Sequence, residues 1–491
     1  MKKEASYNFN HTLSLVFISF LFIGLPLFVN RAFFNITQAK TLFFLALCVV
    51  LFIGFGFIFI SDLIKKKIKP IKPNVLDLFV LLFGIFYIFS AILSEYQTDV
   101  WYGKNSRLQG AIIILLYVIV YFIISNNLKL LDFKTYIWKY LIAGFILTSL
   151  VAILNGFNID LFGFFQGVDD FYLDKFISTV GNINFYSGYI CLCLPILFYI
   201  YIFSENKKND YFYLLFIALS AFSSILASSE GFTLGFIAII AVSPFLLFDK
   251  PKELLRFIIA IGVFWISAST FLQIYNFYDS GQYISAKTAE LIFSIPITLV
   301  LLSGLSFLYY YILKHSEKIS FVKKGYNIFL LVSFVLLLLA IVYANIYSLG
   351  KFDSFLKFDD KWGTNRGLIF KLCFRLIGDF SFKEILFGIG PESLQNEKII
   401  YDELFVDQAH CEFLQNFIST GFFGLISQLG IILSTIIILV KNKNNQICCA
   451  VALGLLAYWA QASVNIAQPL TSPFIYVYLA IISSQYKNKL F

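Results

Sequence analysis

The stretch 41–61, TLFFLALCVVLFIGFGFIFIS, contains 21 residues and no charged side chain. The hydrocarbon core of a bilayer is about 30 Å thick, and a helix needs about 20 apolar residues to cross it. This stretch therefore predicts a transmembrane helix.

The same apolar character extends over the whole chain. Of its 491 residues, 59% are hydrophobic and 13% are charged, and the mean hydropathy is +0.82. Soluble domains average about 25% charged residues, so this composition excludes a soluble globular protein and a disordered one. With 28 glycines and seven cysteines, collagen and a disulfide scaffold are excluded too.

Apolar runs bounded by charges predict an all-α, polytopic integral membrane protein with about 12–14 transmembrane helices. The first run lacks a small-residue cleavage site before Arg31, so we interpret it as a retained helix rather than a signal peptide. The fourteen candidate spans are 12–30, 39–61, 75–94, 110–126, 136–155, 183–204, 211–227, 232–248, 254–275, 288–313, 326–347, 413–440, 447–463 and 473–485.

Lysine and arginine predict the orientation. With the N-terminus inside, 22 of them fall in cytoplasmic segments and 14 in outer ones, and eight of those 14 belong to one long loop at 348–412. Short cytoplasmic loops are enriched in these residues. We therefore expect both termini in the cytoplasm, in a multi-pass protein of the plasma or inner membrane. The basic residues are scattered between apolar runs, which indicates no nucleic-acid partner.

The chain divides into three predicted parts: helices 1–11 with short loops (1–347), a long extracytoplasmic loop (348–412) and the C-terminal helices (413–491). The long loop carries eight basic and eleven acidic residues and is expected to contain short helices. Long ordered loops are often functional, so this loop is the candidate catalytic part.

The predicted spans are nearly free of charge. Lys139 lies near one end of its span, and Glu290 and Glu412 lie at the starts of theirs. Ion-coupled transporters place charged residues at mid-membrane depth. The sequence therefore gives no support for an ion pathway and directs attention to the outer loops.

Short polar segments flank several spans on the outer face. Each one alone has an ordinary explanation, such as a helix cap or an interfacial anchor. Of three histidines, only His410 is predicted to lie outside. The segments are WYGKNSRLQG (101–110), GNIN (181–184), SSEG (228–231), NRG (365–367), FGIG (387–390) and AHCEFLQ (409–415).

In their order along residues 100–440, these segments resemble the O-antigen ligase and O-antigen polymerase family of membrane glycosyltransferases. That family has a Gly-Asn-Pro-Asn-like helix start, a Phe-Gly-x-Gly turn in a large outer loop, and an Ala-His-Asn-Glu-Phe end to that loop. Its histidine is followed by two glycines at the spacing of Gly421 and Gly424. This chain departs from the family at Cys411, where an amide or hydroxyl residue is usual, and at Glu230, where arginine is frequent.

The resemblance implies extracytoplasmic transfer of an oligosaccharide or polysaccharide from polyprenyl diphosphate to an acceptor during surface-polysaccharide assembly in the cell envelope. Repeat-unit polymerase and glycan ligase both fit. The expected partners are the lipid-linked donor, a glycan, lipid or protein acceptor, membrane lipids and other polysaccharide-assembly proteins. No cofactor is expected.

Arginine pairs bidentately with phosphate oxygens. Arg366 is therefore the predicted catalytic arginine, and Arg107 and Arg375 are predicted diphosphate ligands, although an ion pair within the loop explains Arg375 equally well. His410 is predicted to activate the acceptor hydroxyl. Three residues are expected to support the site: Glu412, Asn182 and Asn184.

Several alternatives stay open. The acidic pairs 169–170 and 359–360 could bind a cation, but solvated charge is the simpler interpretation, and no histidine or cysteine cluster has metal-ligand spacing. Cys373 and Cys411 could pair, but two free thiols are the simpler expectation. A polysaccharide exporter or a flippase for lipid-linked glycans fits the same hydropathy. Such a protein would require a polar or cationic central cavity, and the nearly uncharged spans argue against one.

Overall fold

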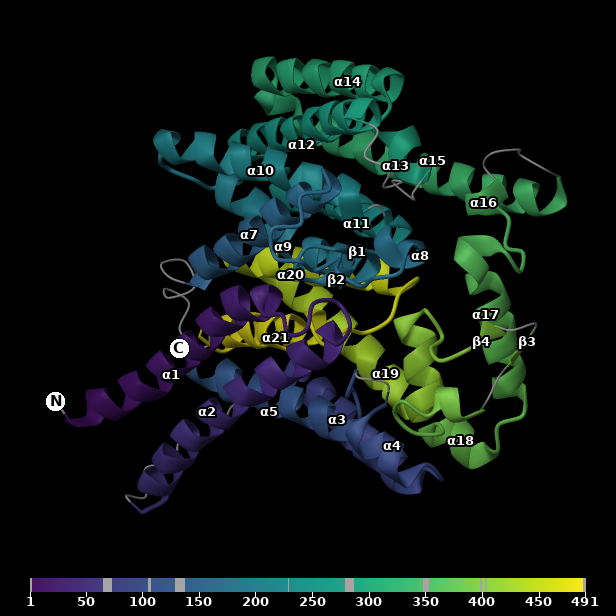
Figure 1. Ribbon diagram of the computed structural model, residues 1–491. Helices are drawn as coiled ribbons and strands as arrows, with labels where there is room; N and C mark the ends of the chain where they lie inside the picture. Colours follow the sequence, from purple (N-terminus) through teal and green to yellow (C-terminus); the bar gives the residue numbers. More distant parts are fainter. Residues whose placement is uncertain are drawn as a thin grey trace.

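The computed structural model describes residues 2–64, 73–104, 107–128, 137–227, 229–278, 287–347, 353–397, 400–401 and 404–488 (Figure 1). Parts of the predicted loops and motifs lie outside these residues: 65–72, 105–106, 228, 348–352, 398–399 and 402–403.

One helix occupies each of thirteen predicted spans, whereas the span 288–313 is divided between α13 (Lys287–Ile292) and α14 (Ile295–Lys314). The all-α fold class is confirmed. Within the described residues, eleven helices are long and apolar enough to cross a membrane, and α5 and α20 are shorter apolar helices. The fourteen helices are α1 (Lys2–Leu27), α2 (Ile36–Ile64), α3 (Val75–Leu93), α5 (Ala111–Asn127), α7 (Trp138–Gly156), α9 (Ile183–Ile202), α10 (Lys207–Ala227), α11 (Glu230–Leu247), α12 (Pro251–Tyr278), α14 (Ile295–Lys314), α15 (Ile319–Ile346), α19 (Glu412–Lys441), α20 (Gln446–Ala462) and α21 (Thr471–Asn488).

The long loop contains short helices, as expected. They are α16 (Asp353–Leu356), α17 (Trp362–Gly378), α18 (Phe382–Phe387) and the 3₁₀ turn η4 (Leu394–Glu397). Two small antiparallel hairpins pair β1 (Phe176–Ile177) with β2 (Gly181–Asn182), and β3 (Ile400–Tyr401) with β4 (Leu404–Phe405). The remaining short helices are α4 (Gln97–Tyr102), α8 (Asp170–Leu173), α13 (Lys287–Ile292) and the turn η2 (Ser316–Lys318).

Helix α9 forms the centre of the bundle. It packs against α20, α10 and α11, and most of its residues are buried. A helix that is apolar on all sides belongs either in a protein interior or in lipid. Helices α14 and α15 are equally apolar but largely exposed, and in Figure 1 α14 lies at the rim of the bundle, with α17 and α18 along one side. We call the side that carries α17 and α18 the loop end.

Two charged side chains inside predicted spans are buried, which corrects the expectation that the spans contain almost no charge. Lys40 of α2 is 2% exposed. Its ammonium group donates to the carbonyl oxygens of Pro26 (2.8 Å) and Phe28 (2.7 Å), just where α1 ends. A cation at a helix C-terminus satisfies free carbonyls and complements the helix dipole. Lys40 therefore has a structural explanation.

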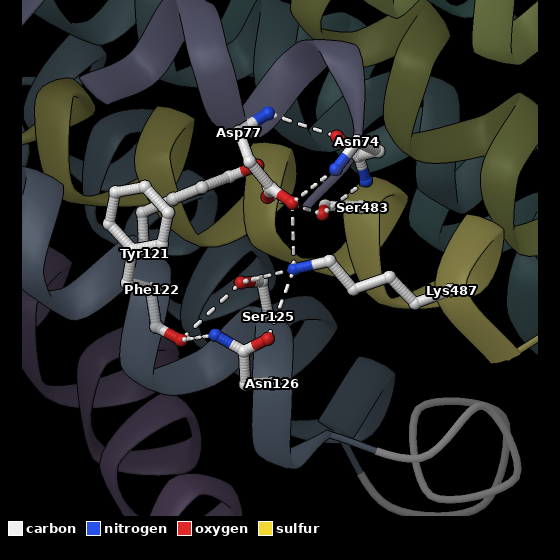
Figure 2. Close-up of polar contacts among 8 residues, drawn as sticks. All are labelled: Asn74, Asp77, Tyr121, Phe122, Ser125, Asn126, Ser483 and Lys487. Atoms are coloured by element: carbon white, nitrogen blue, oxygen red, sulfur yellow. Dashed lines mark hydrogen bonds and ion pairs between the residues drawn. The ribbon is translucent and has the colours of Figure 1, made fainter. Parts of the chain in front are cut away.

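The second buried charge, Asp77, lies in the first turn of α3 (Figure 2). One carboxylate oxygen accepts from the Tyr121 hydroxyl (2.6 Å) and the Ser483 hydroxyl (2.9 Å). The other accepts from the Asn74 backbone N–H (2.8 Å) and pairs with the Lys487 ammonium (2.9 Å). Four donors thus satisfy a carboxylate that is 2% exposed.

Lys487 extends this network to the end of α5. Its ammonium group also donates to the Asn126 side-chain oxygen (3.1 Å) and the Ser125 hydroxyl (3.4 Å). The network therefore joins the start of α3, the end of α5 and the C-terminal helix α21 (Figure 2).

We predict that Asp77→Asn lowers the free energy of unfolding by about 3–5 kcal/mol, because it leaves the Lys487 ammonium buried without a counter-charge. The double variant Asp77→Asn/Lys487→Gln should regain part of that loss. Thermal unfolding of the detergent-purified protein measures both effects.

The matched control is Asp249→Asn. Asp249 pairs with Lys443 at the surface, where both side chains are about half exposed, so its loss should change stability by less than about 1 kcal/mol. Additive effects of the Asp77 and Lys487 substitutions would contradict the coupling.

Candidate functional site

The site begins with a break in α19. Gly421 has φ 65° and ψ −161°, a conformation that is essentially restricted to glycine. A Cβ at this position would lie 2.4 Å from the backbone of Leu386 and Phe387. Glu412 and Gln428 are 16 residues apart, yet their side chains lie 3.3 Å apart. A straight helix would separate them by about 24 Å, so α19 bends sharply at Gly421.

The 387–390 turn donates hydrogen bonds to carbonyl oxygens of α19 just before the break at Gly421. The N–H groups of Ile389 and Gly390 donate to the carbonyl oxygens of Ile418 (2.9 Å) and Ser419 (3.0 Å). The Ser90 hydroxyl of α3 donates to the Ser419 carbonyl as well (2.5 Å). The Phe-Gly-x-Gly segment found in the sequence therefore fastens the long loop onto the broken helix.

His410 lies two residues before α19, with φ 49°. Its side chain is half-buried. Among the described residues, neither ring nitrogen has a hydrogen-bond partner. Burial is the largest cause that lowers the pKa of His410 to about 4; the positive charges of Arg366 and Arg107 contribute to the lowering, and the Asp407 carboxylate opposes it. The ring is therefore neutral at physiological pH, with a lone pair able to accept a proton.

Arg366 of α17 lies near His410 with an incompletely satisfied guanidinium group. It follows a left-handed turn in which Gly363, Thr364 and Asn365 have φ of 58°, 61° and 70°. Its side chain is 12% exposed, and its Nη1 lies 3.9 Å from a Glu230 carboxylate oxygen.

Only part of the Arg366 hydrogen-bonding capacity is used. Nη1 donates to the Gly363 carbonyl (3.2 Å), whereas the buried Nε has no hydrogen-bond partner within the described part of the chain. Burial lowers the pKa of Arg366 and the Glu230 carboxylate opposes this, but the group stays charged in proteins. A buried cation with free donors is suited to binding an anion.

Arg107 approaches His410 from the segment before α5. It forms an ion pair with Asp407 of the long loop (2.5 Å). Glu392 lies nearby: burial raises its pKa, the Arg107 charge opposes the rise, and the Gln408 amide donates to its carboxylate (3.3 and 3.4 Å). Arg107 thus joins two parts of the site and already has an acidic partner.

Arg375 is not brought to this cluster. It follows Arg366 by nine residues on α17, which is two and a half helical turns and places it on the opposite side of the helix. Its side chain is exposed.

Glu412 faces the bundle interior. Its carboxylate accepts from the Tyr458 hydroxyl of α20 (2.9 Å) and from the Gln428 amide (3.3 Å). It therefore connects the two segments of α19 to α20, rather than acting only as a helix cap.

The two predicted asparagines shape neighbouring turns. Asn182 caps α9 by accepting from the Asn184 N–H (2.8 Å). The Asn184 side-chain oxygen accepts from the Ser229 hydroxyl (2.7 Å), and its carbonyl accepts from the Asn465 amide (3.1 Å). Because Ser229 precedes Glu230, Asn184 helps to fix the turn that carries the partner of Arg366.

Strained backbone is concentrated around the cluster. Non-glycine residues with positive φ cost about 1–3 kcal/mol each and often mark functional sites. Those in the segments that build the cluster are Leu108, Thr364, Asn365, Glu392 and His410.

Sequence reasoning missed three contributors to this region: Glu392, Gln428 and Tyr458. The only local signal was the position of Glu392, two residues beyond the Phe-Gly-x-Gly turn. Gln428 and Tyr458 lie in helices, and the bend of α19 brings Gln428 to Glu412.

The structure shows the surroundings of several cysteine and acidic side chains that the sequence left open. Cys373 and Cys411 are free thiols. Asp360 pairs with Lys371 (3.5 Å). Among the residues that the structure describes, no three histidine, cysteine, aspartate or glutamate side chains are grouped so as to hold a metal ion.

Comparison with known proteins adds no assignment. No protein-family model matches this chain, and no curated protein sequence matches it.

Proposed function

We propose that this chain is a membrane glycosyltransferase of the O-antigen ligase and polymerase type. It transfers an oligosaccharide or polysaccharide from polyprenyl diphosphate to an acceptor at the outer face of the plasma or inner membrane, as a repeat-unit polymerase or a glycan ligase. The observation that supports this most is the neutral His410 within electrostatic reach of two arginines, one of which has an unused buried donor.

Arg366 binds the diphosphate in this proposal. When the bond between the anomeric carbon and the phosphate oxygen breaks, the electron pair leaves with the diphosphate, whose negative charge increases. A guanidinium hydrogen-bonded to that oxygen is then more favourable in the transition state than in the ground state. Each such charged hydrogen bond contributes about 1.5–3 kcal/mol.

His410 takes the proton of the acceptor. As the acceptor oxygen bonds to the anomeric carbon, its proton passes to the neutral imidazole. The arginine charges that lower the pKa of His410 are offset by the negative diphosphate once the donor binds. Proton transfer therefore becomes favourable when the donor is in place.

The proposed topology places the long loop outside and both termini in the cytoplasm. In a background where Cys411 is serine, Lys357→Cys should react with a membrane-impermeant thiol reagent in cells whose outer layers have been permeabilised. Lys250→Cys, at the predicted cytoplasmic start of α12, is the control and should react only after lysis. The reverse pattern would overturn the orientation.

Arg366→Lys should reduce glycan transfer about 10- to 100-fold although the charge is kept, because lysine lacks the planar donors that pair with diphosphate. Arg375→Lys is the matched change on the same helix and should transfer at the wild-type rate, because Arg375 is exposed on the opposite side. Transfer by purified protein from a labelled lipid-linked glycan measures both. Equal activity of the two variants would place the diphosphate elsewhere.

His410→Ala should lower the rate of transfer about 10²- to 10⁴-fold, the usual contribution of a general base, while binding of the lipid-linked donor persists. Because the pKa of His410 in the free enzyme is about 4, its base form is fully populated above pH 5.5. The wild-type kcat/KM for the donor should therefore be nearly constant between pH 5.5 and 7.5.

Two results would contradict this role. One is an acid limb of kcat/KM centred near the ordinary histidine pKa of about 6.5. The other is a His410→Ala variant that binds donor weakly but turns over bound donor at the normal rate.

A further inference from the structure

Glu230, the partner of Arg366, makes an incomplete ion pair. Its carboxylate oxygen lies 3.9 Å from Arg366 Nη1, and its side chain is 40% exposed against 12% for Arg366. A separation of 3.9 Å is too long for a hydrogen bond. Glu230 therefore neutralises part of the charge of Arg366 without using its donors.

The backbone at Glu230 is nevertheless firmly placed. Ser229 caps α11 by accepting from the Gly231 N–H (3.2 Å), and its hydroxyl donates to Asn184 of α9 (2.7 Å). A Cβ at Gly231 would lie 3.1 Å from the Gln461 side chain of α20. The fold thus fixes the position of Glu230 and leaves its half-exposed carboxylate able to move.

Partial burial acts against the charge of Glu230, whereas the Arg366 guanidinium and the place of Glu230 in its helix favour it. Glu230 lies in the first turn of α11, where the helix dipole stabilises an anion. A negative charge is therefore built in beside the guanidinium group that has free donors.

We propose that Glu230 is a counter-anion that a diphosphate must displace from Arg366, and that it promotes release of the polyprenyl diphosphate product. This inference rests on the proposed function. A lipid diphosphate that approaches Arg366 meets the Glu230 charge, so the carboxylate must turn away toward solvent.

The effect is larger for the product than for the donor. Cleavage of the bond to the anomeric carbon leaves its electron pair on the diphosphate, so the product gains negative charge that the donor did not carry. Repulsion by Glu230 grows with that charge. Glu230 thus weakens product binding more than donor binding.

The test uses the full-length protein in nanodiscs and farnesyl diphosphate, a short polyprenyl diphosphate with a free terminal phosphate. Glu230→Gln should bind farnesyl diphosphate about tenfold more tightly than wild type, since the neutral side chain neither competes for Arg366 nor repels the diphosphate in this half-exposed, partly screened site. The difference should shrink as salt is raised. Glu253→Gln, a change in the first turn of α12, is the matched control and should bind like wild type.

Turnover provides a second measurement. If product release is slowed, Glu230→Gln should show a burst of transfer followed by a steady-state rate below that of wild type. Glu230→Ser is a second uncharged variant, to be used if Glu230→Gln is not recovered folded.

The outcomes separate the inference from the function on which it rests. Wild-type protein that binds farnesyl diphosphate and transfers glycan, with a Glu230→Gln affinity equal to or weaker than wild type, overturns the role of Glu230 alone. Wild-type protein that neither binds farnesyl diphosphate nor transfers glycan overturns the proposed function and this inference with it.

Discussion

The break at Gly421 obliges the surrounding structure to satisfy the backbone that α19 leaves free. Within a membrane an unpaired carbonyl costs several kcal/mol, and broken helices persist only where protein groups replace the missing bonds. The N–H groups of Ile389 and Gly390 and the hydroxyl of Ser90 supply these bonds at the Ile418 and Ser419 carbonyls. The long loop is thereby tied to α3 and α19, and His410, just before α19, is held close to the bundle.

Two carboxylates differ in how many hydrogen bonds hold them in place, and this difference decides whether each can move. Asp77 is buried, and four donors surround it, so moving it would break a network across three helices. Glu230 is half-exposed and has one long contact with Arg366. That contact is too long for a hydrogen bond, so breaking it costs no hydrogen bond. The first arrangement holds the fold, and the second leaves a cation open to exchange of its partner.

The sequence predicts local features far better than contacts between distant segments. The spans are apolar runs with few charges, so hydropathy predicts a helix at each of the fourteen positions but not the break inside 288–313. The spacing of His410, Gly421 and Gly424 was visible, but not the sharp bend at Gly421 that brings Gln428 to Glu412. Asp77 and Lys487 are far apart in the sequence, and no local sequence pattern predicts their pairing.

In the proposed transfer, the electrostatics of the cluster make activation of the acceptor depend on the bound donor. Burial, together with the charges of Arg366 and Arg107, keeps His410 neutral, and taking up a proton there would add a third positive charge to a half-buried region. Asp407 and Glu230 offset only part of this charge, since each already faces an arginine. A bound diphosphate adds at least two negative charges at the same place and makes the protonated ring favourable. The base would therefore gain strength only when the leaving group is present, so that acceptor activation and donor binding depend on one another.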